Sequence, residues 1–378
     1  MALSELPEAL LRKPDVRTST DSRPKRGGSA TKRLLFFVRV RAERASGAYW
    51  RSRMSQFTQA VKRLKLLRDI SRNDGSISVT YQTVMIETTS TCNLDCPICP
   101  ARRSENIIER ANKQIKLEDV RRIVDLTRDM TESYCLNMWG EPLLHKEFRE
   151  ILEYVSSAGK RIWFSSNLNY SPRLAEMLTE FPLLNIICSL DGWDTESYAE
   201  YRWGGRFDVV RKNLAILAKG KCKIYPQYLV TPNDPEMELR KQRFVDFVKT
   251  VVGSTENVYF KNKQIDIRND PGVIAPGRCS SMYAGLYFNS DGCLQPCCTN
   301  VRSDLFMGHI SSFTSEQLIN GQAVKSRRRD IRRDKNQFES CKSCAGEDHQ
   351  KLILKTFATR FVELFVKQDR LPGTSKSL

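Results

Sequence analysis

The sequence predicts an α/β fold in which a parallel sheet carries helices on its outer side. Short β-rich runs alternate with stretches of helical periodicity between residues 78 and 265, in six β-α units. This alternation is typical of parallel sheets, because each strand returns to the same edge through a crossover helix. The 378 residues, 40% of them hydrophobic, suffice for one large domain and a smaller one. Six units are fewer than the eight of a closed barrel, and the pattern alone does not decide whether the sheet closes.

The expected elements follow one another in order along this region. The strands are rich in β-branched and aromatic residues, and we expect them at SVTYQTVMIET (78–88), YCLNMW (134–139), RIWFSSN (161–167), NIICSLD (185–191), KIYPQYLV (223–230) and NVYFKNKQI (257–265). The helices between them have apolar residues at spacings of three and four, and we expect them at 117–130, 146–158, 171–180, 206–219 and 236–252.

The N-terminal segment is far more basic than the rest of the chain. The formal net charge is +17, and residues 1–75 supply +11 of it through 18 Lys and Arg against 7 Asp and Glu. Residues 1–30 are rich in Ser, Thr, Pro, Gly and charge, a composition that favours disorder. Residues 31–78 are expected to form a basic helical extension of the folded body.

One amphipathic helix is expected within this extension, from about residue 51 to residue 70. Its apolar residues recur at spacings of three and four, and they are Met54, Phe57, Val61, Leu64 and Leu67. We expect this helix to pack on the main domain. The alternative is a basic surface for peripheral contact with anionic membranes, or for nucleic acid.

The sequence has no sign of a membrane span or of an export signal. No apolar run reaches the length of about 18 residues that a span needs, and the first residues lack a basic stretch followed by a long apolar one. We therefore expect a cytoplasmic protein. Its twelve cysteines are then better candidates for metal ligands than for disulfides, because the cytosol keeps thiols reduced.

Three cysteines lie close together in TSTCNLDCPICPARR (89–103), directly after the first expected strand. Thiolates at Cys92, Cys96 and Cys99 can wrap a compact inorganic cluster, and two prolines restrict the loop that presents them. Three ligands would leave one iron of a four-iron cluster open. An open coordination position distinguishes a reactive metal site from a closed structural one.

A second, smaller module begins where the β-α alternation stops, and we place it at 266–350. Gly and Pro break the chain in RNDPGVIAPGRC (268–279). Half of the cysteines follow, at Cys279, Cys293, Cys297, Cys298, Cys341 and Cys344. Their number and spacing predict a cysteine-built metal module. Residues 351–378 are assigned to a C-terminal helix and tail.

The loop CNLDCPIC resembles the CxxxCxxC signature of the radical S-adenosylmethionine (radical SAM) superfamily, and the resemblance covers roughly 79–350. It implies a partial (β/α)6 TIM-like barrel as the radical SAM core at 79–265. It also implies that Cys92, Cys96 and Cys99 hold a [4Fe–4S] cluster whose open iron binds S-adenosylmethionine. In that family an electron from the cluster cleaves the cofactor to methionine and a 5′-deoxyadenosyl radical, which abstracts a hydrogen atom from an unreactive C–H bond. A zinc loop or unrelated reduced thiols are the alternative.

The segment WGEPLLH (139–145) resembles the family's GGEP element after the second strand. The resemblance implies that Gly140 and Glu141 contact the methionine amine of the cofactor, although Trp139 stands in place of the first glycine. SSNLN (165–169) resembles the third-strand element of the same family.

The segment CSLDGWDTESYAEYRWGG (188–205) resembles the family's fourth-strand element. It implies that Ser189 and Arg202 contact the carboxylate or ribose of the cofactor. Gln227 on the fifth strand is a further candidate. For each of these polar residues, ordinary capping or strand-end hydrogen bonding is the alternative.

The second module resembles the C-terminal auxiliary-cluster region known as SPASM, in its shortened twitch form. The resemblance implies a second [4Fe–4S] cluster with four ligands, which are Cys279, Cys297, Cys341 and Cys344. The DGxxxPC context favours Cys297 over Cys298, and Cys293 stands where the family usually has an apolar strand residue. Structural zinc is the alternative occupant of four thiolates.

A basic run, KSRRRDIRRDK (325–335), lies between the cysteines of this module. We expect it to be a solvated helix face. If it borders the substrate opening instead, it favours an anionic substrate such as a phosphorylated or nucleotide-linked sugar.

The resemblance predicts a radical SAM oxidoreductase or epimerase that acts on a small molecule such as a sugar, aminocyclitol or related polyol. A reducing partner such as flavodoxin or ferredoxin is implied. One alternative is an enzyme that modifies a peptide or protein side chain. Another, suggested by charge alone, is an RNA-binding or RNA-modifying protein, although nucleic acid is the less expected partner without a recognisable module.

The sequence assigns no acid, base or hydrogen donor to the reaction. We expect structural roles for three charged residues near the end of the sixth expected strand, which are Lys261, Lys263 and Asp266. The three histidines, His145, His309 and His349, form no spaced ligand set.

Overall fold

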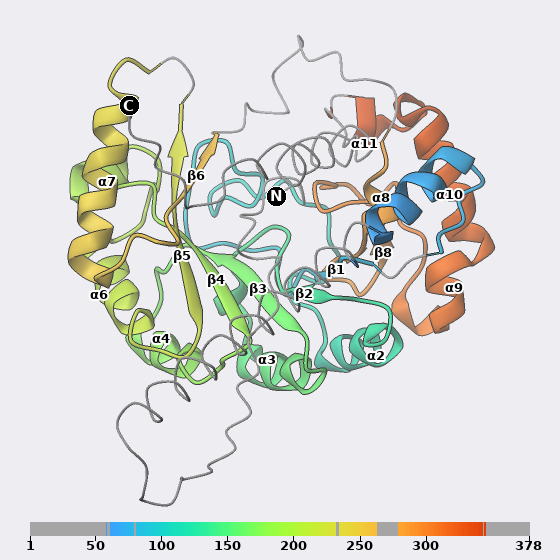
Figure 1. Cartoon of the computed structure of the whole chain (residues 1–378), viewed down its shortest axis with the longest axis horizontal. Coiled ribbons are helices and arrows are strands. Elements are labelled where there is room, and N and C mark those ends of the chain that lie inside the picture. The colour runs from blue at the N-terminus through green and yellow to red at the C-terminus, as the bar shows by residue number, and fades with distance from the viewer. Residues whose placement is uncertain are drawn as a thin grey trace, which may run out of the picture.

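The computed structural model describes residues 58, 61–78, 81–231, 234–262, 279–342 and 344. Within this part of the chain a single sheet has the strand order β6-β5-β4-β3-β2-β1-β7-β8 (Figure 1). Its strands are β1 (Thr83–Ile86), β2 (Ser133–Cys135), β3 (Arg161–Ser166), β4 (Leu184–Ser189), β5 (Lys223–Val230), β6 (Tyr259–Asn262), β7 (Gly285–Phe288) and β8 (Leu294–Gln295). All neighbours pair in parallel except β7 and β8. No pairing joins β6 to β8 among these residues, so the sheet is an open arc and the predicted partial barrel is confirmed.

Five helices alternate with the first six strands and cover the outer side of the arc (Figure 1). They are α2 (Leu117–Thr127), α3 (Phe148–Ser157), α4 (Pro172–Leu178), α6 (Phe207–Leu217) and α7 (Met237–Val252). In α3, for example, Phe148, Ile151 and Val155 form one buried face at helical spacing. Each of these helices lies inside a predicted range. The short α5 (Thr195–Ala199) was not predicted; its N-cap Asp194 forms a capping box with Ser197.

Strand β7 extends the sheet beyond the β-α alternation. It belongs to the cysteine-rich segment, yet it pairs in parallel with β1 along its whole length, from Thr83 opposite Gly285 to Ile86 opposite Phe288. The same segment supplies α8 (Ser281–Ala284), α9 (Ser315–Asn320), α10 (Gln322–Arg333) and α11 (Glu339–Lys342). The cysteine-rich segment is therefore built onto the sheet through shared strand pairing.

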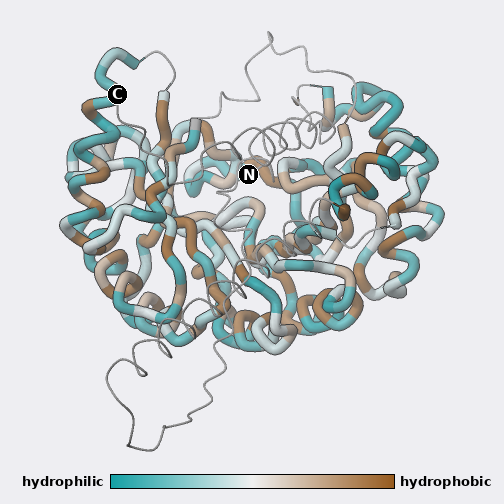
Figure 2. Tube along the Cα trace, viewed as in Figure 1, coloured by the Kyte–Doolittle hydropathy of each residue, from teal (hydrophilic) through white to brown (hydrophobic). Residues whose placement is uncertain are grey.

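The two faces of the sheet bury two separate hydrophobic groups. Val84, Ile162 and Ile186 point to the outer helices and belong to the larger core. Their neighbours along the strands point to the inside of the arc, because side chains alternate along a strand. This inner group consists of Met85, Cys135, Met138, Trp163, Ile187, Tyr225, Tyr287 and Cys298. Figure 2 shows hydrophobic and hydrophilic residues alternating along the outer helices, which bury one face only.

The predicted N-terminal helix is described only in part, as a helix over 61–72. It packs on the main domain, as expected, with a face that overlaps the predicted one. Leu66 and Ile70 are buried in the larger core and the predicted Leu67 packs against it, whereas the predicted Leu64 is 48% exposed. Met54 and Phe57 lie outside the described residues, as do 1–30 and 351–378. None of the described helices is both long and apolar enough to cross a bilayer.

The basic run at 325–335 is not simply a solvated face. It lies mainly in α10, where Arg328 is 1% exposed. Arg328 donates to the carbonyl oxygens of Met282 (3.1 Å), Gly75 (3.0 Å) and Ile319 (2.6 Å), and to the hydroxyl of Tyr81. The guanidinium satisfies main-chain oxygens that would otherwise be buried without a donor. Arg328 is thus a structural residue that joins α10 to α8, to α9 and to the segment before β1.

Candidate active site

The loop after β1 is held tightly against the loop after β2. The amide of Glu141 donates to the carbonyl oxygen of Thr91 at 2.8 Å. Gly140, one residue earlier, has φ +72°, and a Cβ there would lie 2.4 Å from the carbonyl oxygen of Thr89 and 2.6 Å from that of Thr91. Only glycine combines this backbone angle with such a close approach. Glycine is therefore needed at position 140 because it lets the two loops come into contact.

The three cysteines of the first loop are presented by a compact turn. The amide of Cys99 donates to the carbonyl oxygen of Cys96 at 3.1 Å. Residues from two other segments, one after β3 and one after α5, reach the sulfur atoms. Asn167 Nδ2 lies 3.6 Å from Cys92 Sγ, and Arg202 Nη1 lies 3.6 Å from Cys96 Sγ. Donors aimed at sulfur are typical of thiolates that act as cluster ligands.

The chemistry of these thiols fits an iron–sulfur cluster. Burial, then the Glu141 carboxylate, and then the neighbouring Cys99 and Cys96 raise the pKa of Cys92 to about 12. Three thiolates this close together repel one another, so they need a positively charged centre among them. In the described part of the chain, no three Cys, His, Asp or Glu side chains converge as ligands of one metal ion do. A four-iron cluster binds each thiolate through a different iron, so its ligands stand further apart than those of a single ion.

Glu141 is fixed at the centre of the site by the end of β3. It is 2% exposed; Oε1 accepts from Ser166 Oγ at 2.8 Å, and Oε2 accepts from the amide of Asn167 at 2.8 Å. Burial raises the pKa of Glu141 to about 7, although these two hydrogen bonds oppose the shift. A cationic ligand at this carboxylate would favour its charged form. The arrangement suits an ammonium group.

Of the other predicted cofactor contacts, Ser189 ends β4, Gln227 lies within β5, and Arg202 follows α5. Ser189 ends β4 and is paired in register with Gln227 on β5, and both side chains are buried. Ser189 Oγ is already bonded to Ser165 Oγ at 2.7 Å. Arg202 forms an ion pair with the buried Asp191, while its Nε is buried without a partner in the described residues. A bound carboxylate or hydroxyl would accept a hydrogen bond from this buried donor, which lies beside a cysteine.

Four cysteines of the second segment form another group. Burial raises the pKa of Cys297 well above its usual range, and the adjacent Cys298, then Cys344 and Cys279, raise it further. Burial raises the pKa of Cys341 to about 12, and Cys344 and Cys279 again add to the shift. Cys279 and Cys344 therefore lie close to both Cys297 and Cys341. These four residues could hold a closed cluster with no open position.

The other two cysteines of this segment have different neighbours. Cys298 is 3% exposed and packs in the inner group of the arc, where it approaches Cys135 closely enough to raise the pKa of that thiol, after burial. Cys293 forms an isolated bridge with His309 at the start of a turn. The neighbouring residues Cys297 and Cys298 therefore face different surroundings.

Family models account for most of the residues just described. A model of the radical SAM superfamily matches residues 86–243, and a model of SPASM, an iron–sulfur cluster-binding domain, matches residues 279–345. The chain belongs to the radical SAM superfamily. Radical SAM enzymes use S-adenosylmethionine and a [4Fe–4S] cluster, and the SPASM domain adds auxiliary iron–sulfur binding.

The radical SAM chain is similar to several curated proteins over part of its length. The mycofactocin maturase MftC of Mycolicibacterium smegmatis is 26% identical over 146 residues, which are 38% of this chain and 35% of MftC. A probable GTP 3′,8-cyclase of Methanocella arvoryzae is 28% identical over 171 residues, which are 44% of this chain and 53% of the cyclase. The chain therefore spans about a third to a half of the length of these relatives.

Solved structures share the fold of this radical SAM enzyme. SuiB of Streptococcus suis, bound to S-adenosylmethionine, superposes with a TM-score of 0.50 at 14% identity, over 66% of this chain and 68% of SuiB. The structure titled native anSMEcpe with bound AdoMet gives 0.51 at 16% identity, over 75% of this chain and 98% of that one. At such identities the likeness concerns the fold alone.

Sequence reasoning missed several groups that the radical SAM site brings together. Ser166 and Asn167 were in the quoted third-strand element but were not named as contacts, and their position directly after a buried strand was the available signal. Asp191, the partner of Arg202, carried no signal beyond its place at a strand end.

Of the residues left without a role in the reaction, His145 accepts from the Glu147 amide and its Nε2 contacts the carbonyl oxygen of Ile115. His309 lies 3.4 Å from Asp119. Lys261 lies on β6, whereas Lys263, Asp266 and His349 lie outside the described residues.

Proposed function

We propose that this radical SAM enzyme modifies a side chain of a peptide or protein. Cys92, Cys96 and Cys99 would hold the cluster that binds S-adenosylmethionine, and the SPASM cysteines Cys279, Cys297, Cys341 and Cys344 would hold the auxiliary cluster. The bound cluster and cofactor would supply a 5′-deoxyadenosyl radical. The chain's own residues orient the cofactor: Glu141 would receive its ammonium group, and Arg202 its carboxylate or ribose.

The observation that supports a peptide substrate is the open arc of the sheet. The SPASM segment joins the sheet at β1 through β7, and β6 and β8 remain unpaired with each other in the described residues. An arc open on one side admits a chain whose ends extend beyond the site, whereas small ligands are usually enclosed by concave walls. The proposal is supported by relatives, since SuiB has been solved with the precursor peptide SuiA and anSMEcpe with a Kp18Cys peptide.

A small-molecule substrate is the second candidate, because a GTP 3′,8-cyclase is also among the similar proteins. For either substrate, oxidation and epimerisation differ in the product. Oxidation removes two hydrogens, whereas epimerisation returns one hydrogen to the opposite face. If the enzyme epimerises, Cys298 is a better-placed hydrogen donor than Cys293, because Cys298 packs inside the arc.

The substrate class is tested with extracts of source cells grown in deuterated medium. The extract is separated by ultrafiltration into a macromolecular and a low-mass fraction, and each is added to the anaerobic holoenzyme with S-adenosylmethionine and a reductant. We expect deuterium to appear in 5′-deoxyadenosine with the macromolecular fraction only, and protease treatment should abolish it.

Deuterium transfer from the low-mass fraction alone would replace the peptide proposal with the small-molecule candidate. The Cys92→Ala/Cys96→Ala/Cys99→Ala variant serves as the control that no labelled product arises without the first cluster. Mass spectrometry of unlabelled substrate after turnover in deuterated water then separates oxidation, a loss of two mass units, from epimerisation, a gain of one.

A further inference from the structure

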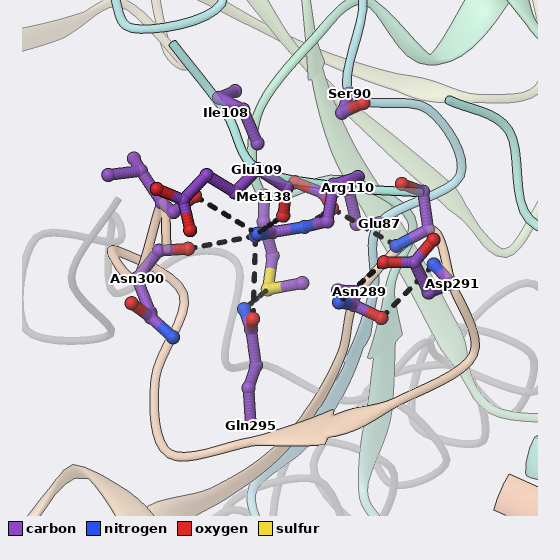
Figure 3. Close-up of polar contacts among 12 residues, drawn as sticks. Glu87, Ser90, Ile108, Glu109, Arg110, Met138, Asn289, Asp291, Gln295 and Asn300 are labelled. Atoms are coloured by element: carbon purple, nitrogen blue, oxygen red, sulfur yellow. Dashed lines mark hydrogen bonds and ion pairs between the residues drawn. The ribbon is translucent and has the colours of Figure 1, made fainter. Parts of the chain in front are cut away.

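A buried arginine outside the predicted site spans the radical SAM core and the SPASM segment. The side chains of Arg110 and Glu87 are both 0% exposed, and Arg110 Nε donates to Glu87 Oε2 at 2.8 Å (Figure 3). Glu87 directly follows β1, five residues before Cys92. Arg110 therefore binds the end of the strand that leads into the first cysteine loop.

The other donors of Arg110 all point to main-chain or amide oxygens. Nη2 donates to the carbonyl oxygen of Asn300 at 2.8 Å and to Gln295 Oε1 at 3.4 Å. Nη1 donates to the carbonyl oxygens of Val301 at 3.2 Å and of Glu109 at 2.8 Å. Three of these four acceptors belong to the SPASM segment 295–301, which contains Cys297.

Gln295 continues the contact to the cysteine itself. Its Oε1 accepts from Arg110, and its Nε2 contacts Met138 Sδ at 3.4 Å (Figure 3). The same Nε2 donates to the carbonyl oxygen of Cys297 at 2.9 Å. Only β8, two residues long, gives regular structure to this stretch. The position of Cys297 therefore depends on these side-chain contacts more than on strand pairing.

Fold stability alone does not explain a fully buried ion pair. Removing Arg110 and Glu87 from water is costly, and well-packed apolar residues often stabilise a core as well or better. The guanidinium adds five N–H donors in a fixed plane. These donors hold an irregular loop at a defined distance and angle from β1. Residues that orient metal ligands in this way commonly change affinity or activity by about 10- to 100-fold when replaced.

We infer that Arg110 is a positioning residue for the auxiliary cluster. Through Gln295 and the carbonyl oxygens of residues 300 and 301, it fixes the Cys297 loop against the end of β1 and so sets the auxiliary cluster relative to the first cysteine loop. This inference rests on the proposed role of Cys297 as a ligand. It predicts that a change at Arg110 or Gln295 alters the auxiliary cluster without loss of the fold.

The test uses the full chain with the Cys92→Ala/Cys96→Ala/Cys99→Ala background, in which only the auxiliary cluster remains. Gln295→Leu removes the contact to Cys297 without leaving a buried charge unpaired, and Arg110→Lys keeps the charge but loses the planar donor set. Asn185→Leu is the matched control, because Asn185 is a buried amide that donates to two carbonyl oxygens at the amino end of β4. Each variant is reconstituted with iron and sulfide and measured by electron paramagnetic resonance, by redox titration and by iron release to a chelator.

We expect Gln295→Leu and Arg110→Lys to shift the resonance signal and midpoint potential of the auxiliary cluster and to release iron roughly tenfold faster. Asn185→Leu should leave all three unchanged at a comparable loss of thermal stability. Unaltered spectra, potential and iron release in a folded Gln295→Leu variant would overturn the inference. Cys297→Ser separates the two assignments: if this variant retains the cluster unchanged, the ligand assignment has failed rather than the role of Arg110 alone.

Discussion

The hydroxyl of Ser166, the last residue of β3, donates a 2.8 Å hydrogen bond to the carboxylate of Glu141, which comes from the loop after β2. Together with the amide of Asn167, this contact fixes both carboxylate oxygens before any ligand is present. A preset carboxylate binds a cation without first losing side-chain entropy. The geometry therefore predicts that Glu141 controls cofactor affinity.

Glu141→Gln should weaken binding of S-adenosylmethionine without loss of the cluster. A charge-assisted hydrogen bond in a buried site contributes about 1.5–3 kcal/mol, which corresponds to roughly a tenfold to hundredfold higher Kd. Equilibrium dialysis of the reconstituted enzyme measures the affinity, and iron analysis verifies the cluster. An unchanged Kd would mean that the loop beginning at Trp139 presents the cofactor differently from the GGEP element.

The same carboxylate should make cofactor binding depend on pH. Burial raises the pKa of Glu141 to about 7 in the free protein, so the group is increasingly protonated as the pH falls below that value. An ammonium ligand requires the ionised form, so the affinity should fall by roughly tenfold per pH unit below about pH 7 and level off above it. Glu141→Gln should remove this dependence. A pH profile that is the same in both proteins would assign the titration to another group.

Gly140→Ala should damage the first cluster site, because its Cβ would lie 2.4 Å from the carbonyl oxygen of Thr89. Strain of this kind costs about 1–3 kcal/mol, and relief of the clash would move the two loops apart. Gly159→Ala is the matched control, since Gly159 also has a positive φ, +64°, but a Cβ there meets nothing within 4 Å. Urea unfolding should show a loss in both variants, while reduced iron binding should appear in Gly140→Ala alone. Equal iron content in the two variants would contradict the close approach of the loops.

The three cysteines of the first loop should be replaceable without loss of the fold. The Cys92→Ala/Cys96→Ala/Cys99→Ala variant should lose roughly four irons per chain, retain the auxiliary iron and form no 5′-deoxyadenosine. Cys222→Ala, a buried cysteine near the start of β5, should keep the full iron content. Reductive cleavage of S-adenosylmethionine by the triple variant would exclude the assignment.

Lys335 should tune the auxiliary cluster through its charge. It is 1% exposed, and its Nζ donates to the carbonyl oxygen of Cys341 at 2.8 Å. Loss of a buried positive charge beside a cluster disfavours the reduced form, so Lys335→Met should lower the midpoint potential and cost about 1.5–3 kcal/mol of stability. Lys342→Met is the control, because Lys342 follows Cys341 directly but is exposed and paired with Glu339. Identical potentials in the two variants would remove Lys335 from this role.

Local sequence patterns determined the secondary-structure elements and the spacing of the cysteines in the first loop. The strand KIYPQYLV was predicted at its observed bounds, Lys223–Val230, because a strand and its pleat depend on neighbouring residues. The spacing of Cys92, Cys96 and Cys99 likewise lies within eight residues of one loop. Patterns of this length can be recognised in the sequence alone.

Tertiary structure alone decided which distant groups meet. The pairing of β7 with β1 joins residues about 200 positions apart, and the contact between Arg110 and Asn300 spans 190 positions. Arg328, part of a run that looked solvated, is buried because the carbonyl oxygen of Gly75 and the hydroxyl of Tyr81 lie beside α10. No local periodicity encodes such contacts, since the free energy that selects them comes from burying the whole sheet and from satisfying buried polar atoms once it has formed.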